Sequence, residues 1–193
     1  MIQGMLGPSL VAPERLRRLT RAEYDSLIKL GFFDEDERIE LLYGMLVKMS
    51  PIGGRHNFVV SSLTELLVLA LAKRAMIRPQ CSFAASDDSE PEPDIAVVAP
   101  GDYIDDHPTT AWLVVEVAES SLDTDRGAKG ALYATSNVLE YWIVNVENNT
   151  VEVYRDPSAG RYKRMTTHGR GDRITLVQFP DLTVNLDDVL PPR

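Results

Sequence analysis

The sequence AWLVVEVAESS (residues 111–121) has the composition of a strand from the centre of a sheet. A run that is apolar on both faces is typical of a strand covered on both sides, as in sheets flanked by helices. Glu116 lies in the middle of the run, where an ionised carboxylate costs on the order of several kcal/mol unless something pairs with it. Alternation places Glu116 on the face of Trp112, Val114 and Ala118. The stretch therefore predicts an α/β sheet and raises the question of what pairs with Glu116.

The composition of the whole chain narrows the class of protein. With 193 residues, 44% hydrophobic and 25% charged, the chain suits one soluble domain. Its net charge of -9 argues against a protein that coats nucleic acid, but it leaves room for an enzyme with a local basic rim. The single cysteine, Cys81, cannot form an internal disulfide, and no Cys/His spacing indicates a zinc or iron–sulfur site. The longest apolar stretch, residues 66–72, is too short for a membrane span, and the N-terminus lacks a signal-peptide pattern, so we expect a cytoplasmic protein without membrane contact.

The pattern of the chain predicts one domain over residues 20–190, after an irregular leader over residues 1–19. Thr20 and Glu23 form a capping box at the start of a helix that Gly31 ends. A longer helix is predicted over residues 56–75, with its apolar positions at Phe58, Leu63, Leu66, Leu67 and Ala70. A third helix is predicted over residues 123–138, although its glycines weaken it.

Short strands are predicted between and after these helices. Residues 38–51 read as a hairpin turning at Tyr43-Gly44, and residues 140–156 as a hairpin turning near Asn148-Asn149. The remaining strand-like segments are residues 78–84, 94–99 and 112–118, with further short strands in residues 161–176 and 181–190. We expect these strands to form a mixed sheet.

A second carboxylate lies at a comparable place. Asp94 directly follows Pro93, at the start of the apolar strand pattern. If this strand pairs with the strand of Glu116, the two acids face the same side at the strand ends. Carboxylates held a few ångströms apart repel each other, raise each other's pKa, or share a cation. Oxygen ligands from Asp and Glu suit Mg²⁺ or Mn²⁺.

The helix after the strand of Glu116 carries a lysine with suitable spacing. Asp125, Lys129 and Tyr133 recur at intervals of four residues and so share one helix face. A lysine directed at the strand end could position water and stabilise phosphate charge. We therefore expect Lys129 to be the third member of the site, on an exposed helix face where replacement by alanine changes stability within ~0.5 kcal/mol. For Tyr133 a core position is the alternative to lining the site.

The motifs PEPD (91–94), EVAESSLDTDRGAK (116–129) and EYWIVN (140–145), in this order, resemble the Uma-two family of predicted endonucleases, within the PD-(D/E)XK nuclease superfamily. The resemblance extends from about residue 20 to residue 190. It implies a restriction-endonuclease-like core, with a mixed β-sheet flanked by helices, and Asp94 and Glu116 as ligands of Mg²⁺ or Mn²⁺. The acidic residue that the family carries ahead of the metal strands corresponds to Glu40, as an additional ligand or a group that contacts one.

The chain departs from the superfamily pattern at one position. That pattern has a lysine two residues after the strand acid, where this chain has Ala118. In the Uma-two pattern a lysine on the following helix takes this role, which assigns it to Lys129. His56 follows two glycines and an arginine at a helix start. A contact to phosphate or metal and a purely structural role are both open for it.

These features predict a metal-dependent nuclease that acts on nucleic acid, with DNA as the expected substrate. Asp94 and Glu116 would hold Mg²⁺, and Lys129 would orient water or stabilise the developing charge. The alternative is a catalytically weak or inactive descendant that keeps the fold and serves as a binding or assembly module, which Ala118 and the acidic net charge favour. For Glu116 alone, a structural ion pair with a lysine or arginine is the alternative to metal binding.

Two further expectations concern surfaces. The hairpin EYWIVNVENNTVEVY (140–154) carries large apolar and aromatic side chains that one small domain would not cover alone. We therefore expect a homodimer, with Tyr141 and Trp142 as packing or dimer contacts. The acidic run that includes Asp87, Asp88, Glu90 and Glu92 is expected to form a solvated loop.

Overall fold

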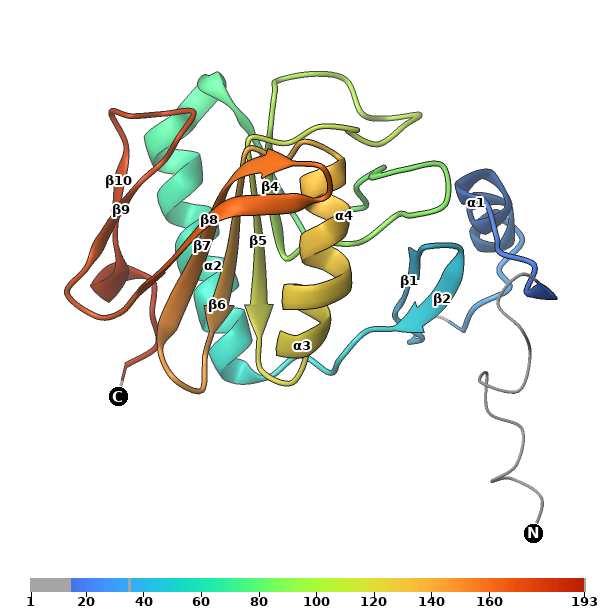
Figure 1. Cartoon of the computed structure of the whole chain (residues 1–193), viewed down its shortest axis with the longest axis horizontal. Coiled ribbons are helices and arrows are strands. Elements are labelled where there is room, and N and C mark those ends of the chain that lie inside the picture. The colour runs from blue at the N-terminus through green and yellow to red at the C-terminus, as the bar shows by residue number, and fades with distance from the viewer. Residues whose placement is uncertain (1–14, 35, 193) are drawn as a thin grey trace, which may run out of the picture.

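A six-stranded mixed sheet forms the centre of the molecule in the computed structural model, which describes residues 15–34 and 36–192 (Figure 1). The strand order is β3-β4-β5-β6-β7-β8, and β5 and β6 are parallel while the other neighbours are antiparallel. The strands are β3 Met76–Pro79, β4 Ile95–Val98, β5 Leu113–Ala118, β6 Glu140–Asn145, β7 Thr150–Ser158 and β8 Arg161–His168. The predicted fold class, a mixed sheet flanked by helices, is confirmed.

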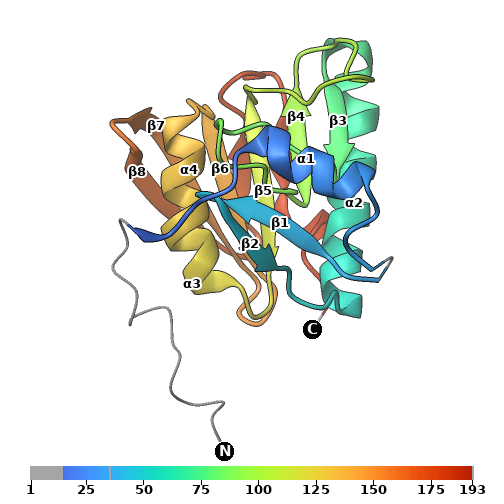
Figure 2. The same cartoon turned by 90° about the vertical axis from the view of Figure 1, so that its right-hand side faces the viewer.

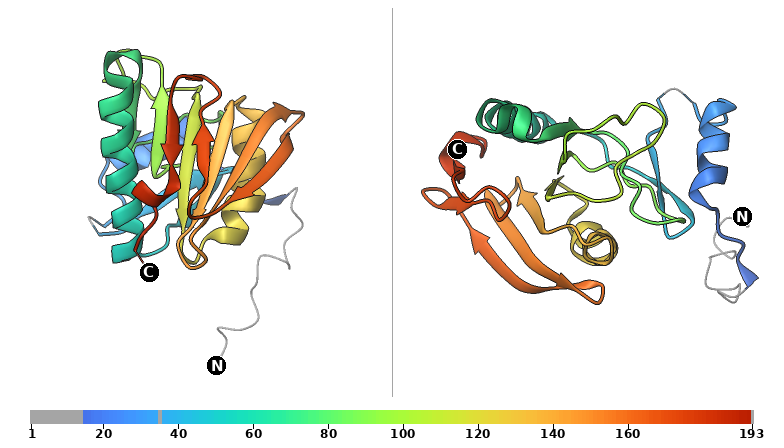
Figure 3. Two further views of the ribbon diagram at one scale, coloured as in Figure 1. Left: turned by 90° about the vertical axis from the view of Figure 1, so that its left-hand side faces the viewer. Right: turned by 90° about the horizontal axis from the view of Figure 1, so that it is seen from above.

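Both faces of the sheet are covered, as the apolar run of β5 predicts. All six residues of β5 are buried. Leu113, Val115 and Val117 join the core beneath α2 (Gly54–Leu71), whereas Val114 and Ala118 pack with residues of α4 (Gly130–Thr135). Figure 3 shows α2 and α4 on opposite sides of the sheet.

The expected alternation of side chains between the two faces of the sheet fails at one end of β5. Trp112 packs against the core that contains Leu113 and Val115, although the pattern predicted it on the face of Glu116. The physical reason is that β5 begins at Leu113, so Trp112 is not bound by the extended geometry that gives a strand its period of two.

The long helix α2 is confirmed, but part of its predicted apolar face is wrong. The core face consists of His56, Val59, Val60, Leu63, Leu67 and Leu71. Phe58 is 41% exposed, because it lies two residues from Val60 and so about 200° around the helix. Ala70 is also exposed. Together with the turn that follows, residues Gly54–Arg74 could cross a membrane by length and composition alone, but one face of α2 is buried on the sheet, as in the core helix of a globular domain.

The N-terminal elements follow their sequence signals. The capping box of Thr20 and Glu23 begins α1 (Arg21–Lys29), and β1 (Ile39–Leu42) and β2 (Met45–Lys48) form the expected hairpin. Tyr43 and Gly44 both have positive φ, as a two-residue hairpin turn requires. Figure 2 shows the hairpin crossing in front of the sheet below α1. Of the predicted leader, residues 1–14 lie outside the described residues, and Leu19 donates a backbone hydrogen bond to the Gly44 carbonyl.

Two predicted elements differ from the structure in detail. The strand predicted over residues 78–84 ends at Pro79, because Gln80 adopts a positive φ of 49° that leaves the extended region. The helix predicted over residues 123–138 has three parts, α3 (Leu122–Thr124), the π-helical turn η4 (Asp125–Lys129) and α4. The C-terminal strands are β9 (Arg173–Thr175) and β10 (Thr183–Asn185), followed by the short 3₁₀ helix Leu186–Asp188.

Two expectations about surfaces are wrong. The hairpin of β6 and β7 turns at Asn149 as predicted, but its large side chains are covered: Tyr141 and Trp142 are fully buried within the chain, which confirms the packing role, one of the two expected for them. The uncovered apolar surface from which the homodimer was expected is therefore absent, and the homodimer itself stays a prediction. Glu90, expected in a solvated loop, is 1% exposed because its backbone pairs with Leu41 of β1.

Candidate functional site

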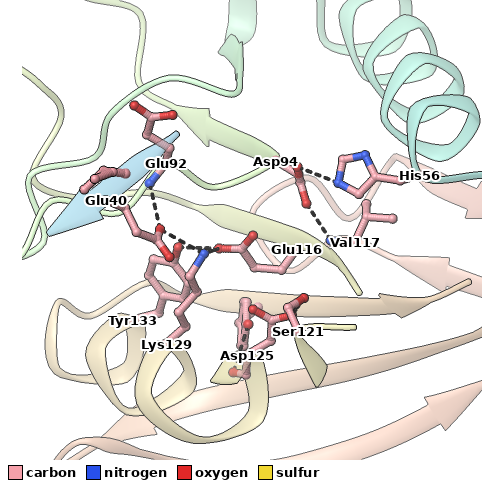
Figure 4. Close-up of polar contacts among 12 residues, drawn as sticks. Glu40, His56, Glu92, Asp94, Glu116, Val117, Ser121, Asp125, Lys129 and Tyr133 are labelled. Atoms are coloured by element: carbon pink, nitrogen blue, oxygen red, sulfur yellow. Dashed lines mark hydrogen bonds and ion pairs between the residues drawn. The ribbon is translucent and has the colours of Figure 1, made fainter. Parts of the chain in front are cut away.

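A polar pocket of about 140 Å³ lies between the β1–β2 hairpin, the start of α2, the end of β5 and η4 (Figure 4). Every residue that the sequence predicted for the site lines this pocket: Glu40, His56, Asp94, Glu116 and Lys129. These residues come from five different segments of the chain, so the fold brings them together as predicted.

Glu116 has two side-chain partners. Its Oε1 atom accepts hydrogen bonds from Lys129 Nζ at 3.1 Å and from Tyr133 Oη at 2.7 Å. Burial raises the pKa of the Glu116 carboxyl well above its ordinary value, and the nearby Lys129 only partly offsets this effect. The ion pair that the sequence left as the alternative for Glu116 is therefore present.

Lys129 lies between two acids. Its Nζ atom is 3.0 Å from Glu40 Oε2 and 3.1 Å from Glu116 Oε1. Burial by itself disfavours the ammonium, but the charges of Glu116 and Glu40 outweigh it and raise the pKa of Lys129. The expected exposed position is wrong, since Lys129 is 5% exposed on the helix face that packs on the sheet.

Asp94 is fixed beside Glu116 by the sheet. The antiparallel register of β4 and β5 pairs Ile95 with Val115, and one further step sets Asp94 opposite Glu116. Asp94 Oδ2 accepts a hydrogen bond from the Val117 backbone N–H at 2.8 Å. The other carboxylate oxygen, Oδ1, lies 2.9 Å from Nε2 of His56 in the first turn of α2.

The pocket contains more buried acid than buried base. Glu40, Asp94, Glu116 and Asp125 are between 1% and 7% exposed, and Lys129 is the lysine that faces them. Burial raises the pKa of Asp125, whose carboxylate also accepts a hydrogen bond from a neighbouring serine. Buried acids in excess of their basic partners either hold protons or take up a cation.

The donors of the pocket fit a hard divalent cation. They are carboxylate oxygens, which Mg²⁺ and Mn²⁺ prefer. Among the described residues, Asp94 and Glu116 do not form a set of three ligand atoms within 4.8 Å with any other His, Cys, Asp or Glu side chain. Mg²⁺ usually keeps several waters and binds only one or two carboxylates, so a cation in this pocket would be held by few protein ligands.

Glu40 and His56 contact the other site residues. Glu40 Oε2 binds Lys129 and also accepts a hydrogen bond from the Glu92 backbone N–H at 3.3 Å. The Nδ1 atom of His56 is buried and has no hydrogen-bond partner among the described residues. In this arrangement Glu40 orients the lysine, and His56 orients Asp94.

Sequence reasoning left several lining residues without a role. One such residue is Asp125, which accepts a hydrogen bond from Ser121. The sequence did indicate its place, because Asp125 lies four residues before Lys129 and so on the same helix face. Arg38 and Lys48 lie at the pocket through the β1–β2 hairpin. No pattern indicated these two, because charged residues on hairpins are commonly only solvated.

Comparison with known proteins agrees with the fold and the motifs. A family profile named Uma2, described as "Putative restriction endonuclease", matches residues 21–187. A crystal structure described as "a putative nuclease belonging to DUF820", from Anabaena variabilis ATCC 29413, has a similar fold, with a TM-score of 0.71 and 15% sequence identity. The similarity covers 89% of this chain and 97% of that one. No curated protein sequence matches the chain. Because the family profile spans most of the sequence, including all five predicted site residues, the chain belongs to the Uma2 family, and it shares the fold of that crystal structure.

Proposed function

We propose that the protein is a metal-dependent endonuclease that hydrolyses phosphodiester bonds of DNA, with Mg²⁺ or Mn²⁺ held by Asp94 and Glu116. The observation that carries this proposal is the group of four buried acids around one lysine, which leaves negative charge for a cation to neutralise. Membership of the Uma2 family supports the nuclease class, because the description of that family is "Putative restriction endonuclease".

The side chains of the pocket have distinct roles in this proposal. When bound, Mg²⁺ supplies Lewis acidity, which lowers the pKa of water and neutralises charge on the phosphate. Asp94 is held by the Val117 N–H and by His56, so its carboxylate is preorganised for the cation. Lys129 keeps its proton beside Glu116 and can stabilise negative charge that develops on the phosphate.

The departure at position 118 supports the helix lysine. Ala118 is 2% exposed and packs in the cluster that contains Tyr133 and Tyr141, so a long side chain does not fit there. Lys129 enters from η4 instead and contacts the same Glu116 carboxylate. The positive side chain that the superfamily pattern has two residues after the strand acid is thus replaced by a lysine of the helical segment that follows the strand.

The pocket also offers cations for a phosphate backbone. Arg38 and Lys48 lie at its edge, on and beside the β1–β2 hairpin. Arg and Lys contacts to phosphates supply most of the affinity of a protein for nucleic acid. The net charge of -9 confines such attraction to local groups of this kind.

A binding or assembly module is the second candidate function. It is favoured by one specific observation, that Lys129 and Tyr133 both donate hydrogen bonds to Oε1 of Glu116. In such a module Lys129 is the permanent counter-charge of the pocket, and divalent cations bind feebly.

Calorimetric titration with Mg²⁺ and Mn²⁺, followed by nicking of supercoiled plasmid DNA, separates the two functions. The nuclease should bind the cation and nick DNA, and Asp94→Asn should lose both properties. Asp123→Asn is the matched control, because Asp123 is exposed in α3 and does not line the pocket. Lys129→Met should lose nicking while it binds the cation at least as tightly, since a nearby positive charge is removed. An unmodified protein that neither binds the cations nor nicks DNA would instead support the binding module.

A further inference from the structure

Three potential metal ligands meet outside the pocket of Glu116. Asp25 of α1, Glu90 of the segment before β4, and His107 of the segment before β5 each place one ligand atom within 4.8 Å of the others. This Asp25–Glu90–His107 cluster lines a second pocket, and none of the residues of that pocket belongs to the first.

One carboxylate oxygen of the buried member of the cluster lacks a hydrogen-bond partner. Glu90 is 1% exposed, and its Oε2 atom has no hydrogen-bond partner among the described residues. Burial raises the pKa of Glu90 to about 7, which reflects the cost of its charge at this position. A buried polar atom that is left unsatisfied in this way requires an explanation, and an ion is one of the common ones.

We propose that Asp25, Glu90 and His107 form a binding site for a divalent transition-metal cation, with zinc as the best fit. One imidazole with two carboxylates suits zinc, whereas Mg²⁺ prefers oxygen ligands alone. Glu90 Oε1 and His107 Nε2 are 3.4 Å apart. Ligand atoms bound tetrahedrally at ~2.1 Å are separated by about 3.4 Å, so these two already have the required spacing. The pocket that the cluster lines leaves the fourth position to water.

The segments that carry the ligands are already tied together. Asp106 Oδ1 accepts hydrogen bonds from the His107 N–H at 2.8 Å and from Arg21 of α1 at 3.0 Å. The Arg21 backbone N–H in turn donates to the Asp87 carbonyl at 2.7 Å. The three segments therefore hold their positions before the cation binds, which lowers the conformational entropy lost on binding.

The site would act on stability rather than on the reaction. It joins α1 to two loops that are distant in sequence, so the cation works as a cross-link. Glu90 also pairs through its backbone with Leu41, the residue after Glu40 in β1. Zinc at the cluster would thus stabilise the β1–β2 hairpin, which carries Glu40 of the first pocket.

The test uses zinc as the probe in a protein in which competing zinc binding is suppressed. The parent is the full chain with Asp94→Asn and Cys81→Ser, in excess Mg²⁺, so that neither the first pocket nor the free thiol competes. Zinc binding is measured by competition with a chromophoric chelator, and the zinc-dependent rise in melting temperature is measured in parallel. The parent should bind one zinc, and Asp25→Asn should bind it at least ~10-fold more weakly.

Matched variants keep the test decisive. Asp105→Asn should bind zinc like the parent, because Asp105 lines the same pocket but is exposed and outside the cluster. His107→Gln should lose zinc binding with a circular dichroism spectrum like that of the parent, and it serves in case Asp25→Asn fails to fold. Zinc binding by Asp25→Asn and His107→Gln as tight as in the parent would overturn the proposal. A parent that takes up no zinc, so that Glu90 and His107 form only an ion pair, would overturn it as well.

Discussion

Replacing Lys129 with methionine removes one buried charge and nearly preserves side-chain length, so it measures what the ion pairs of the pocket contribute. The Nζ atom lies 3.0 Å from Glu40 and 3.1 Å from Glu116, and both acids are buried. Removing one partner of a buried ion pair costs about 3–5 kcal/mol, because the charges left behind are uncompensated. For a chain of this length each kcal/mol corresponds to roughly 2–4 °C, so the melting temperature should fall by roughly 6–20 °C.

The loss should depend on pH. Burial already raises the pKa of Glu116, and removal of the ammonium raises it further. Between the ordinary value of 4.5 and this raised pKa, the folded state holds a proton that the unfolded state has lost. Stability therefore falls as pH rises through that window. The unmodified protein loses stability with the same slope up to its own Glu116 pKa, so the deficit of Lys129→Met should grow between that pKa and the higher Glu116 pKa of the variant.

Thermal unfolding monitored by circular dichroism, with a chelator present and at several pH values, provides the measurement. Lys48→Met is the matched control, because Lys48 also lies 3.1 Å from a carboxylate, that of Glu37, but its side chain is 78% exposed. An exposed pair of this kind should change stability by less than ~1 kcal/mol. If Lys129→Met unfolds within about 2 °C of the unmodified protein at alkaline pH, the buried ion pairs do not have the energetic role assigned here. Saturating Mg²⁺ should recover part of the loss, because the cation replaces the missing positive charge.

Three further substitutions test buried contacts, two of them next to the site and one at the far end of the sheet. Ala118→Lys places a lysine at the position where the superfamily pattern has one. It should lower the free energy of unfolding in urea by about 1–3 kcal/mol without increasing DNA nicking, because the position is 2% exposed. A stable variant with higher activity would contradict this packing argument. Tyr133→Phe removes a hydrogen bond to Glu116 and should cost about 1.5–3 kcal/mol while moving the carboxyl titration, followed by infrared spectroscopy, to higher pH; an unchanged titration would show that the bond is absent. Glu140→Ala removes the carboxylate that accepts from the buried Trp142 indole N–H and pairs with Arg155. The free energy of unfolding in urea should fall by about 3–5 kcal/mol, whereas a fall below about 1 kcal/mol would show that water replaces the carboxylate.

The central sheet and the first pocket could be predicted because their signals are local. An apolar strand with one acid, a Pro-Asp start to its neighbour, and a lysine at helical spacing each occupy a short stretch of sequence. The antiparallel register then sets Asp94 opposite Glu116 without further information. The family motif supplied what the spacing could not, the place of Glu40 ahead of the strands.

The burial of the site residues and their contacts with distant segments of the chain could not be predicted in the same way. Lys129 looked like a residue on an exposed helix face, because sequence spacing does not show which element covers that face. The acids Asp25 and Glu90 and the imidazole of His107 lie in three segments that share no motif, and they meet only after α1 packs on two loops. Tertiary contacts of this kind leave no periodic trace in the chain.

The π-helical turn constrains how the chain can change in length. In η4 the Gly130 N–H donates to the Asp125 carbonyl five residues back, so this turn holds one residue more than an α-helical turn. Loss of one residue from a regular α-helical turn rotates everything that follows by about 100°. In η4 the loss of one residue within Arg126–Ala128 would instead convert the bond between the Gly130 N–H and the Asp125 carbonyl into that of an ordinary α-helical turn, so Lys129 and Tyr133 would still face the sheet. The chain can therefore shorten by one residue in η4 without separating the lysine from its acids, whereas the same loss in α4 would turn the residues after it away from the sheet.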